Sequence, residues 1–88
     1  MLSSKNMAKA LEQAGIKVVS FEESKNPEVM DGEVSLENSL SVQVGSDYAC
    51  LCRIEKDDID YLLEMEELHN VTDFAREVAK FIQSGQCS

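Results

Sequence analysis

The sequence is poor in the features that mark a membrane span or a nucleotide site. Its 88 residues contain no tryptophan, one proline, one histidine and four glycines that lie far apart. No stretch approaches the roughly 20 apolar residues of a membrane-spanning helix. The scattered glycines do not form a phosphate-binding loop, which needs several close together. We therefore expect neither a membrane-spanning segment nor a nucleotide cofactor.

Basic residues are also scarce. The chain has eight Lys and Arg residues against 17 Asp and Glu residues, which gives a formal net charge of −9. Proteins bind nucleic acids and anionic membranes by placing Lys and Arg against phosphates, so this balance disfavours both partners. A basic protein is the partner that such a charge attracts.

Three cysteines are present, an odd number without the spacing of a disulfide framework. Cys50 and Cys52 on one strand would lie about 6.5–7 Å apart between Cα atoms, at the upper limit for a disulfide. The N-terminal residues have no apolar run after their first charge, so no secretory signal is expected. We therefore predict free thiols and a cytoplasmic location.

The first third of the chain predicts a helix and a strand. Ser3 or Ser4 can cap a helix whose apolar stripe is Met7, Leu11 and Ala14, and Gly15 can end it. The β-branched and aromatic residues of 16–22 predict a strand. Residues 23–32 hold two turn dipeptides and are predicted to be a loop.

The middle of the chain predicts a β-hairpin. Apolar residues alternate through 33–44, which indicates one half-buried strand, and a second alternating segment follows at 48–55. A three-residue loop at 45–47 would place Val44 opposite Tyr48. In that register Cys50 and Cys52 face the core, and Ala49 and Leu51 face away from it.

Residues 57–69 are ambiguous between helix and strand. The Leu, Met and Glu residues favour helix, whereas the alternation of Ile59, Tyr61, Leu63 and Met65 favours strand, and we predict a strand. The final segment, 71–82, has the spacing of an amphipathic helix. Asn70 or Thr72 can start it and Gly85 can end it, with 86–88 a frayed tail.

The predicted architecture is a single α+β domain over residues 1–88. The element order α-β-β-β-β-α gives a two-layer sandwich, in which an antiparallel four-stranded sheet carries both helices on one face.

No residue set predicts a catalytic or metal site. Cys50, Cys52, Cys87 and His69 have the composition of a zinc site but none of its paired spacings. Free cysteine is among the most buried residue types, so Cys50 and Cys52 are predicted to be core residues. No cofactor is expected.

The carboxylates concentrate between residues 55 and 67, where seven acids and one lysine carry −6 of the net −9. Such a run is most often a solvated face, and otherwise a recognition surface for a basic partner. The predicted register would also expose an apolar strip of Ala49, Leu51 and Leu62 beside these carboxylates.

These features predict a non-enzymatic protein-interaction module, in one version a homodimer. Its binding residues would be Ala49, Leu51 and Leu62 together with Asp60, Glu64 and Glu66. A second hypothesis is an acidic inhibitor that mimics nucleic acid in a basic groove of its target. A third, the weakest, is a small enzyme that uses a metal or a thiol with His69.

Overall fold

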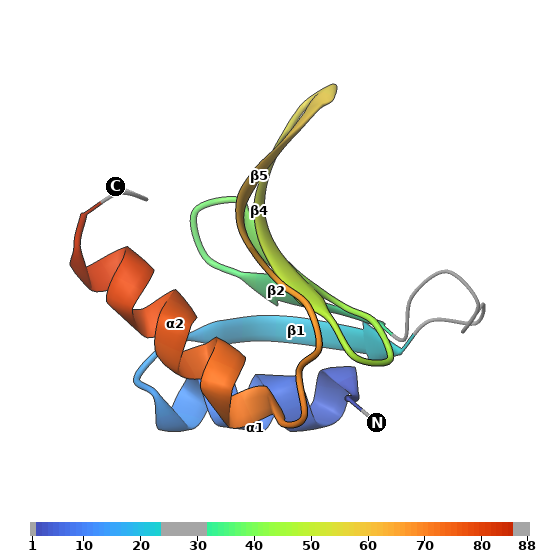
Figure 1. Cartoon of the computed structure of the whole chain (residues 1–88). Coiled ribbons are helices and arrows are strands. Elements are labelled where there is room, and N and C mark those ends of the chain that lie inside the picture. Colours follow the sequence, from blue (N-terminus) through green and yellow to red (C-terminus); the bar gives the residue numbers. More distant parts are fainter. Residues whose placement is uncertain (1, 24–31, 86–88) are drawn as a thin grey trace.

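The computed structural model describes residues 2–23 and 32–85 and contains two helices and five strands (Figure 1). Its sheet is antiparallel, and the strands lie side by side in chain order. The predicted α+β class is therefore confirmed, and the predicted number of four strands is wrong. Most of the predicted 23–32 loop, and the 86–88 tail, lie outside the described residues. The elements are α1 Ser4–Gln13, β1 Val18–Glu23, β2 Gly32–Leu36, β3 Leu40–Val44, β4 Ala49–Glu55, β5 Asp58–Met65 and α2 Val71–Gln83.

The fifth strand arises because the segment predicted as one strand turns back on itself. Asn38 and Ser39 both have positive φ angles, 62° and 65°, and the amide of Leu40 donates to the carbonyl of Glu37. Two such residues in succession are typical of tight hairpin turns, where asparagine is favoured. Val34 of β2 and Val42 of β3 lie opposite each other, so even-numbered residues stay on one face across the turn. The apolar alternation consequently continues through a reversal of the chain, with Asn38 as its one polar interruption.

The register of β3 and β4 also differs from the prediction. Val44 lies opposite Ala49 and Val42 opposite Leu51, so the connection has four residues instead of three. The amide of Gly45 donates to the carbonyl of Tyr48 over 2.7 Å, which closes this turn. A Cβ atom at Gly45 would collide with the Tyr48 ring, so glycine here lets that ring lie against the turn. The extra loop residue moves every side chain of β4 to the opposite face from the predicted one.

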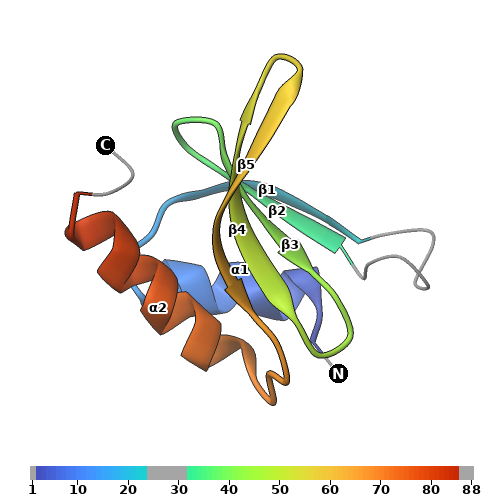
Figure 2. The ribbon, with the colours of Figure 1, turned by 45° about the horizontal axis from the view of Figure 1, so that its top comes forward.

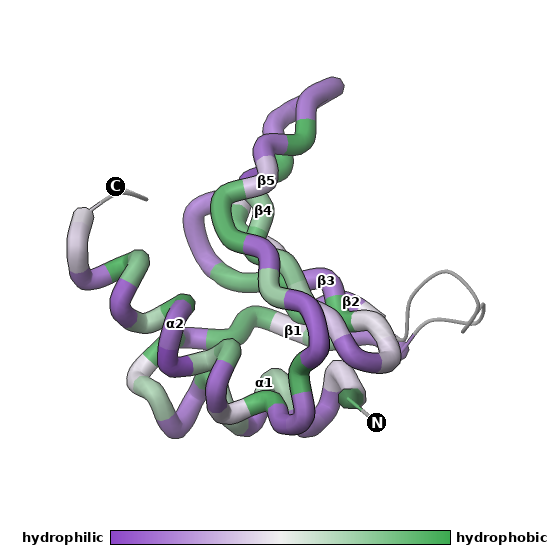
Figure 3. Tube along the Cα trace, viewed as in Figure 1, coloured by the Kyte–Doolittle hydropathy of each residue, from purple (hydrophilic) through white to green (hydrophobic). Residues whose placement is uncertain are grey.

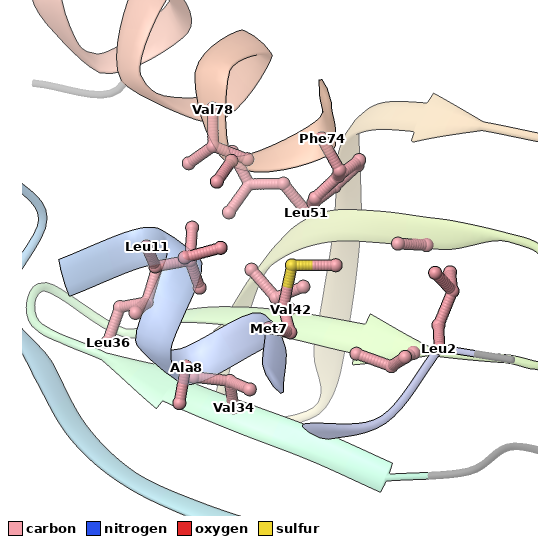
Figure 4. Packing of buried hydrophobic residues seen from close by; sticks show 14 of the residues in the cluster. Leu2, Met7, Ala8, Leu11, Val34, Leu36, Val42, Leu51, Phe74 and Val78 are labelled. Atoms are coloured by element: carbon pink, nitrogen blue, oxygen red, sulfur yellow. The ribbon is translucent and has the colours of Figure 1, made fainter. Parts of the chain in front are cut away.

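One hydrophobic cluster joins both helices to one face of the sheet, called here the inner face (Figure 4). Met7 and Leu11 of α1 lie over β2 and β3, while Phe74 and Val78 of α2 lie over Leu51. The two helices also pack against each other, and Figure 2 shows them side by side. The fully buried members that fix this face are Met7, Leu11, Val34, Val42, Val44, Ala49, Leu51, Phe74 and Val78.

The helix ends confirm the boundaries predicted from the sequence. Ser3 caps α1 by accepting a hydrogen bond from the Asn6 amide at 3.2 Å. Asn70 caps α2 by accepting from the Asp73 amide at 3.0 Å. Gly15 follows α1 with a φ of 89°, a left-handed conformation that glycine adopts without strain.

The observed register predicts that Leu51 is essential to stability. Leu51→Ala should lower the free energy of unfolding by about 2–5 kcal/mol, because it leaves a cavity beneath α2. Ile54→Ala, on the same strand but half-exposed, should cost less than about 1 kcal/mol. Urea denaturation of the two variants measures this difference, and equal losses would contradict the register.

Candidate functional site

The hairpin of β4 and β5 projects from the body of the molecule, with its tip far from both helices (Figures 1 and 2). Because Ala49 and Leu51 face inward, alternation places Tyr48, Cys50, Cys52 and Ile54 on the opposite, outer face of the sheet. None of the described helices covers this face. Tyr48 and Ile54, which the prediction assigned to the core, are therefore exposed, whereas Cys50 and Cys52 are buried on this face.

A β-bulge at Leu62 determines which side chains of β5 join this outer face. Leu51 lies opposite Leu63, whereas the next residue, Cys52, lies opposite Tyr61. The extra residue reverses the alternation of β5. Leu63 and Met65 consequently pack against the core, while Ile59 and Tyr61 lie on the outer face. The strand predicted for this segment is confirmed, but the prediction that its four alternating apolar residues share one face is wrong.

Four large apolar side chains form what we call the outer strip: Tyr48, Ile54, Ile59 and Tyr61. Their relative exposures are 37%, 36%, 47% and 57%, high values for hydrophobic residues of this size. Ile54 and Ile59 lie directly opposite each other near the tip, and Tyr61 lies opposite Cys52. A shallow hollow at the other end brings Tyr48 and Tyr61 together with Gln43, Cys50 and Glu64.

Exposed carboxylates lie along the same hairpin as the outer strip. All seven acids between Glu55 and Glu67 are exposed, as is Lys56 at the turn. Figure 3 shows the tip of the hairpin as largely hydrophilic, interrupted by hydrophobic positions. The hairpin thus combines the outer strip with exposed acids, called here the acidic margin, of which Glu64 lies on the face of the strip and Asp58 and Asp60 on the other face.

The two described cysteines are buried on the outer face, opposite Gln43 and Ser41 of β3. The Cys50 thiol lies 3.8 Å from Oε1 of Gln43, and the Cys52 thiol lies 3.5 Å from the Ser41 carbonyl oxygen. Burial raises the pKa of both thiols, that of Cys52 to about 11. Both are therefore protonated near neutral pH, and a protonated thiol is a poor nucleophile and a poor metal ligand. They are buried, as predicted, but they do not belong to the helix-covered core.

The predicted binding residues divide into two groups. Ala49 and Leu51 are fully buried under the helices, and Leu62 packs partly against the same core, so the predicted exposed strip is wrong. The cause is the four-residue turn, which reversed the faces of β4. Asp60, Glu64 and Glu66 are exposed, with Asp60 opposite Arg53 and Glu64 opposite Cys50. The outer strip was missed because its position depends on that turn and on the bulge.

The described residues of the hypothetical metal or thiol site do not form a cluster of ligands. His69 is exposed in the connection between β5 and α2, and no group of three potential metal ligands occurs within residues 2–23 and 32–85. Cys87 lies outside those ranges.

Comparisons with known proteins give no relative for this chain. No family model, no curated protein sequence and no solved structure matches it. In the part of the chain that the structure describes, neither helix is long and apolar enough to cross a membrane.

The buried thiols should react slowly with alkylating agents. In a Cys87→Ser background only Cys50 and Cys52 remain, and both are shielded and protonated at neutral pH. We expect iodoacetamide to label them much more slowly in the folded protein than in urea. Mass spectrometry over time measures both rates, and equal rates would show that the thiols are accessible.

The raised pKa values also predict a loss of stability in alkali. A thiol whose folded pKa exceeds its ordinary value contributes stability that is complete below the unfolded pKa and disappears as pH rises through the folded one. For Cys52 that window extends from 9.0 to about 11. Urea unfolding across this range should show a larger loss in the parent than in Cys52→Ala, and parallel losses would contradict the assignment.

Proposed function

We propose that this protein is a non-enzymatic interaction module that binds another protein through the outer strip. The observation that carries the proposal is the grouping of exposed hydrophobics. Six large hydrophobic residues are exposed in the described chain, and four of them lie on the outer face of β4, β5 and the turn just before β4. Grouped exposed apolar side chains, especially tyrosines inside a polar rim, are typical of protein-binding surfaces.

The acidic margin favours a basic partner. Opposite charges across an interface increase the association rate and exclude like-charged competitors. A second copy of this chain would bring a net charge of −9 against the same charge, so the homodimer is the weaker version. Light scattering after size-exclusion chromatography gives the molar mass of the purified protein. A monomer agrees with binding to a basic partner, whereas a dimer would show that the partner is a second copy of this chain.

The acidic-inhibitor hypothesis receives less support than the interaction module. A nucleic-acid mimic needs its carboxylates in one row, spaced like phosphates along a groove. The bulge at Leu62 separates them, because Asp58 and Asp60 alternate with the outer strip whereas Glu64 lies on the strip's own face. The protonated state of Cys50 and Cys52 supports a binding role over thiol catalysis.

A matched pair of variants tests the proposal. Tyr61 is 57% exposed on β5 and Val19 is 62% exposed on β1, at opposite edges of the sheet. Tyr61→Ser should weaken binding to the native partner at least tenfold, or about 1.4 kcal/mol. Val19→Ser should leave the affinity unchanged, and neither should alter the unfolding free energy by more than about 1 kcal/mol.

The measurement is affinity capture from the native cell with the parent and both variants, followed by calorimetric titration of the captured protein. A partner that the parent and Val19→Ser retain and Tyr61→Ser loses supports the proposal. A partner retained equally by all three would place the interface elsewhere and overturn it.

A further inference from the structure

The β5 strand forms an edge of the sheet. It is the last strand in the order β1-β2-β3-β4-β5, and no described strand lies beyond it. Its residues from Asp58 to Tyr61 are all exposed. An exposed edge presents backbone amides and carbonyls that can pair with another extended chain.

The hydrogen bonding of β4 identifies which backbone groups of β5 point outward. The Ile54 amide donates to the Ser39 carbonyl at 2.9 Å, so the backbone groups of Ile54 point toward β3 and away from β5. Ile59, which lies opposite Ile54, therefore belongs to a non-hydrogen-bonded pair and directs its own groups to the free edge. Tyr61, opposite Cys52, follows the same alternation. Two successive donor–acceptor pairs thus lie on the open side of the hairpin.

The side chains along this edge specify what could pair there. Ile59 and Tyr61 point to the outer face, while Asp58 and Asp60 alternate with them and point to the other side. Directly opposed residues of an antiparallel pair share a face and interact through their side chains. An added strand would therefore place alternate residues against Ile59 and Tyr61, and the intervening residues against the two carboxylates.

We propose that the β5 edge binds an extended segment of a partner protein in which basic and apolar residues alternate. The segment's amides and carbonyls pair with Ile59 and Tyr61, its apolar side chains extend the outer strip, and its Lys or Arg residues face Asp58 and Asp60. This inference rests on the proposed function and names the chemistry of the partner. Strand addition of this kind gains affinity from the backbone and specificity from alternate side chains.

A second copy of this chain does not meet these requirements. Antiparallel pairing of two β5 strands would set the row of Asp58 and Asp60 against the same row of the other copy. Like charges directly opposed across strands are destabilising. The carboxylates therefore exclude self-pairing and select a basic strand in the same place.

The test uses the full chain and a blocked octapeptide of alternating lysine and valine, titrated by calorimetry and by amide NMR. We expect saturable binding, with the largest amide shifts at Ile59 and Tyr61. Methylating the peptide amides that face β5 should weaken binding at least tenfold, because it removes the backbone donors. Asp58→Asn with Asp60→Asn should weaken it by a similar factor, whereas Glu12→Gln on the exposed surface of α1 should not.

Two control peptides make the outcome decisive. An octapeptide with four lysines followed by four valines keeps the composition but loses the alternation, and it should bind at least tenfold more weakly. An alternating glutamate–valine peptide should not bind. Three outcomes would each overturn the edge proposal: the alternating lysine–valine peptide fails to bind, it binds no more tightly than the peptide with four lysines followed by four valines, or methylation of its amides leaves its affinity unchanged.

Two variants distinguish a failure of the strand-addition proposal from a failure of the proposed interaction module. If Tyr61→Ser loses the native partner but the Asp58 and Asp60 double variant keeps it, the module remains and the strand-addition mode is rejected. If Tyr61→Ser keeps the partner, the interaction surface itself is rejected.

Discussion

The pairing of Val44 with Ala49 is the constraint on which the rest of the structure depends. Side chains alternate along a strand, so this one contact decides that Leu51 enters the helix-covered core and that Cys50 and Cys52 do not. A register one residue shorter would put two small thiols beneath Phe74 and Val78, where the larger Leu51 now fills the space (Figure 4). The resulting loss of buried apolar volume beneath α2 disfavours the three-residue alternative.

The bulge at Leu62 allows β5 to serve two purposes. Without it, Ile59, Tyr61, Leu63 and Met65 would share a face, and the strand would place them all in the core or all in solvent. The bulge turns Leu63 and Met65 inward to complete the core at this edge, and leaves Ile59 and Tyr61 on the outer face. The two halves of β5 therefore have separate roles, one in the core and one in the apolar surface. Substitutions in the exposed half should consequently change the free energy of unfolding little.

The sequence predicted the features that depend on local signals. The caps Ser3 and Asn70 and the stop at Gly15 are visible as residue types at their positions, and the strand at β5 follows from alternation. The prediction was wrong where it depended on how two strands align with each other. The turn at Asn38 preserves parity, so alternation could not reveal it, although Asn38 itself was the one polar interruption. The exposed Asp60 and Glu64 could be predicted from charge alone, whereas the outer strip required both the turn length and the bulge.

The distribution of charge along β5 counteracts the tendency of an exposed strand edge to pair with other copies. Exposed Ile59 and Tyr61, with backbone groups open beside them, would by themselves favour pairing between copies and aggregation. Asp58 and Asp60 alternate with them, so any identical strand meets like charge at every second residue. The same carboxylates leave the backbone accessible to a strand of opposite charge. Of the seven acids between residues 55 and 67, Asp58 and Asp60 are the two that alternate with exposed apolar residues, and they are the two to which the strand-addition proposal assigns selection among strands.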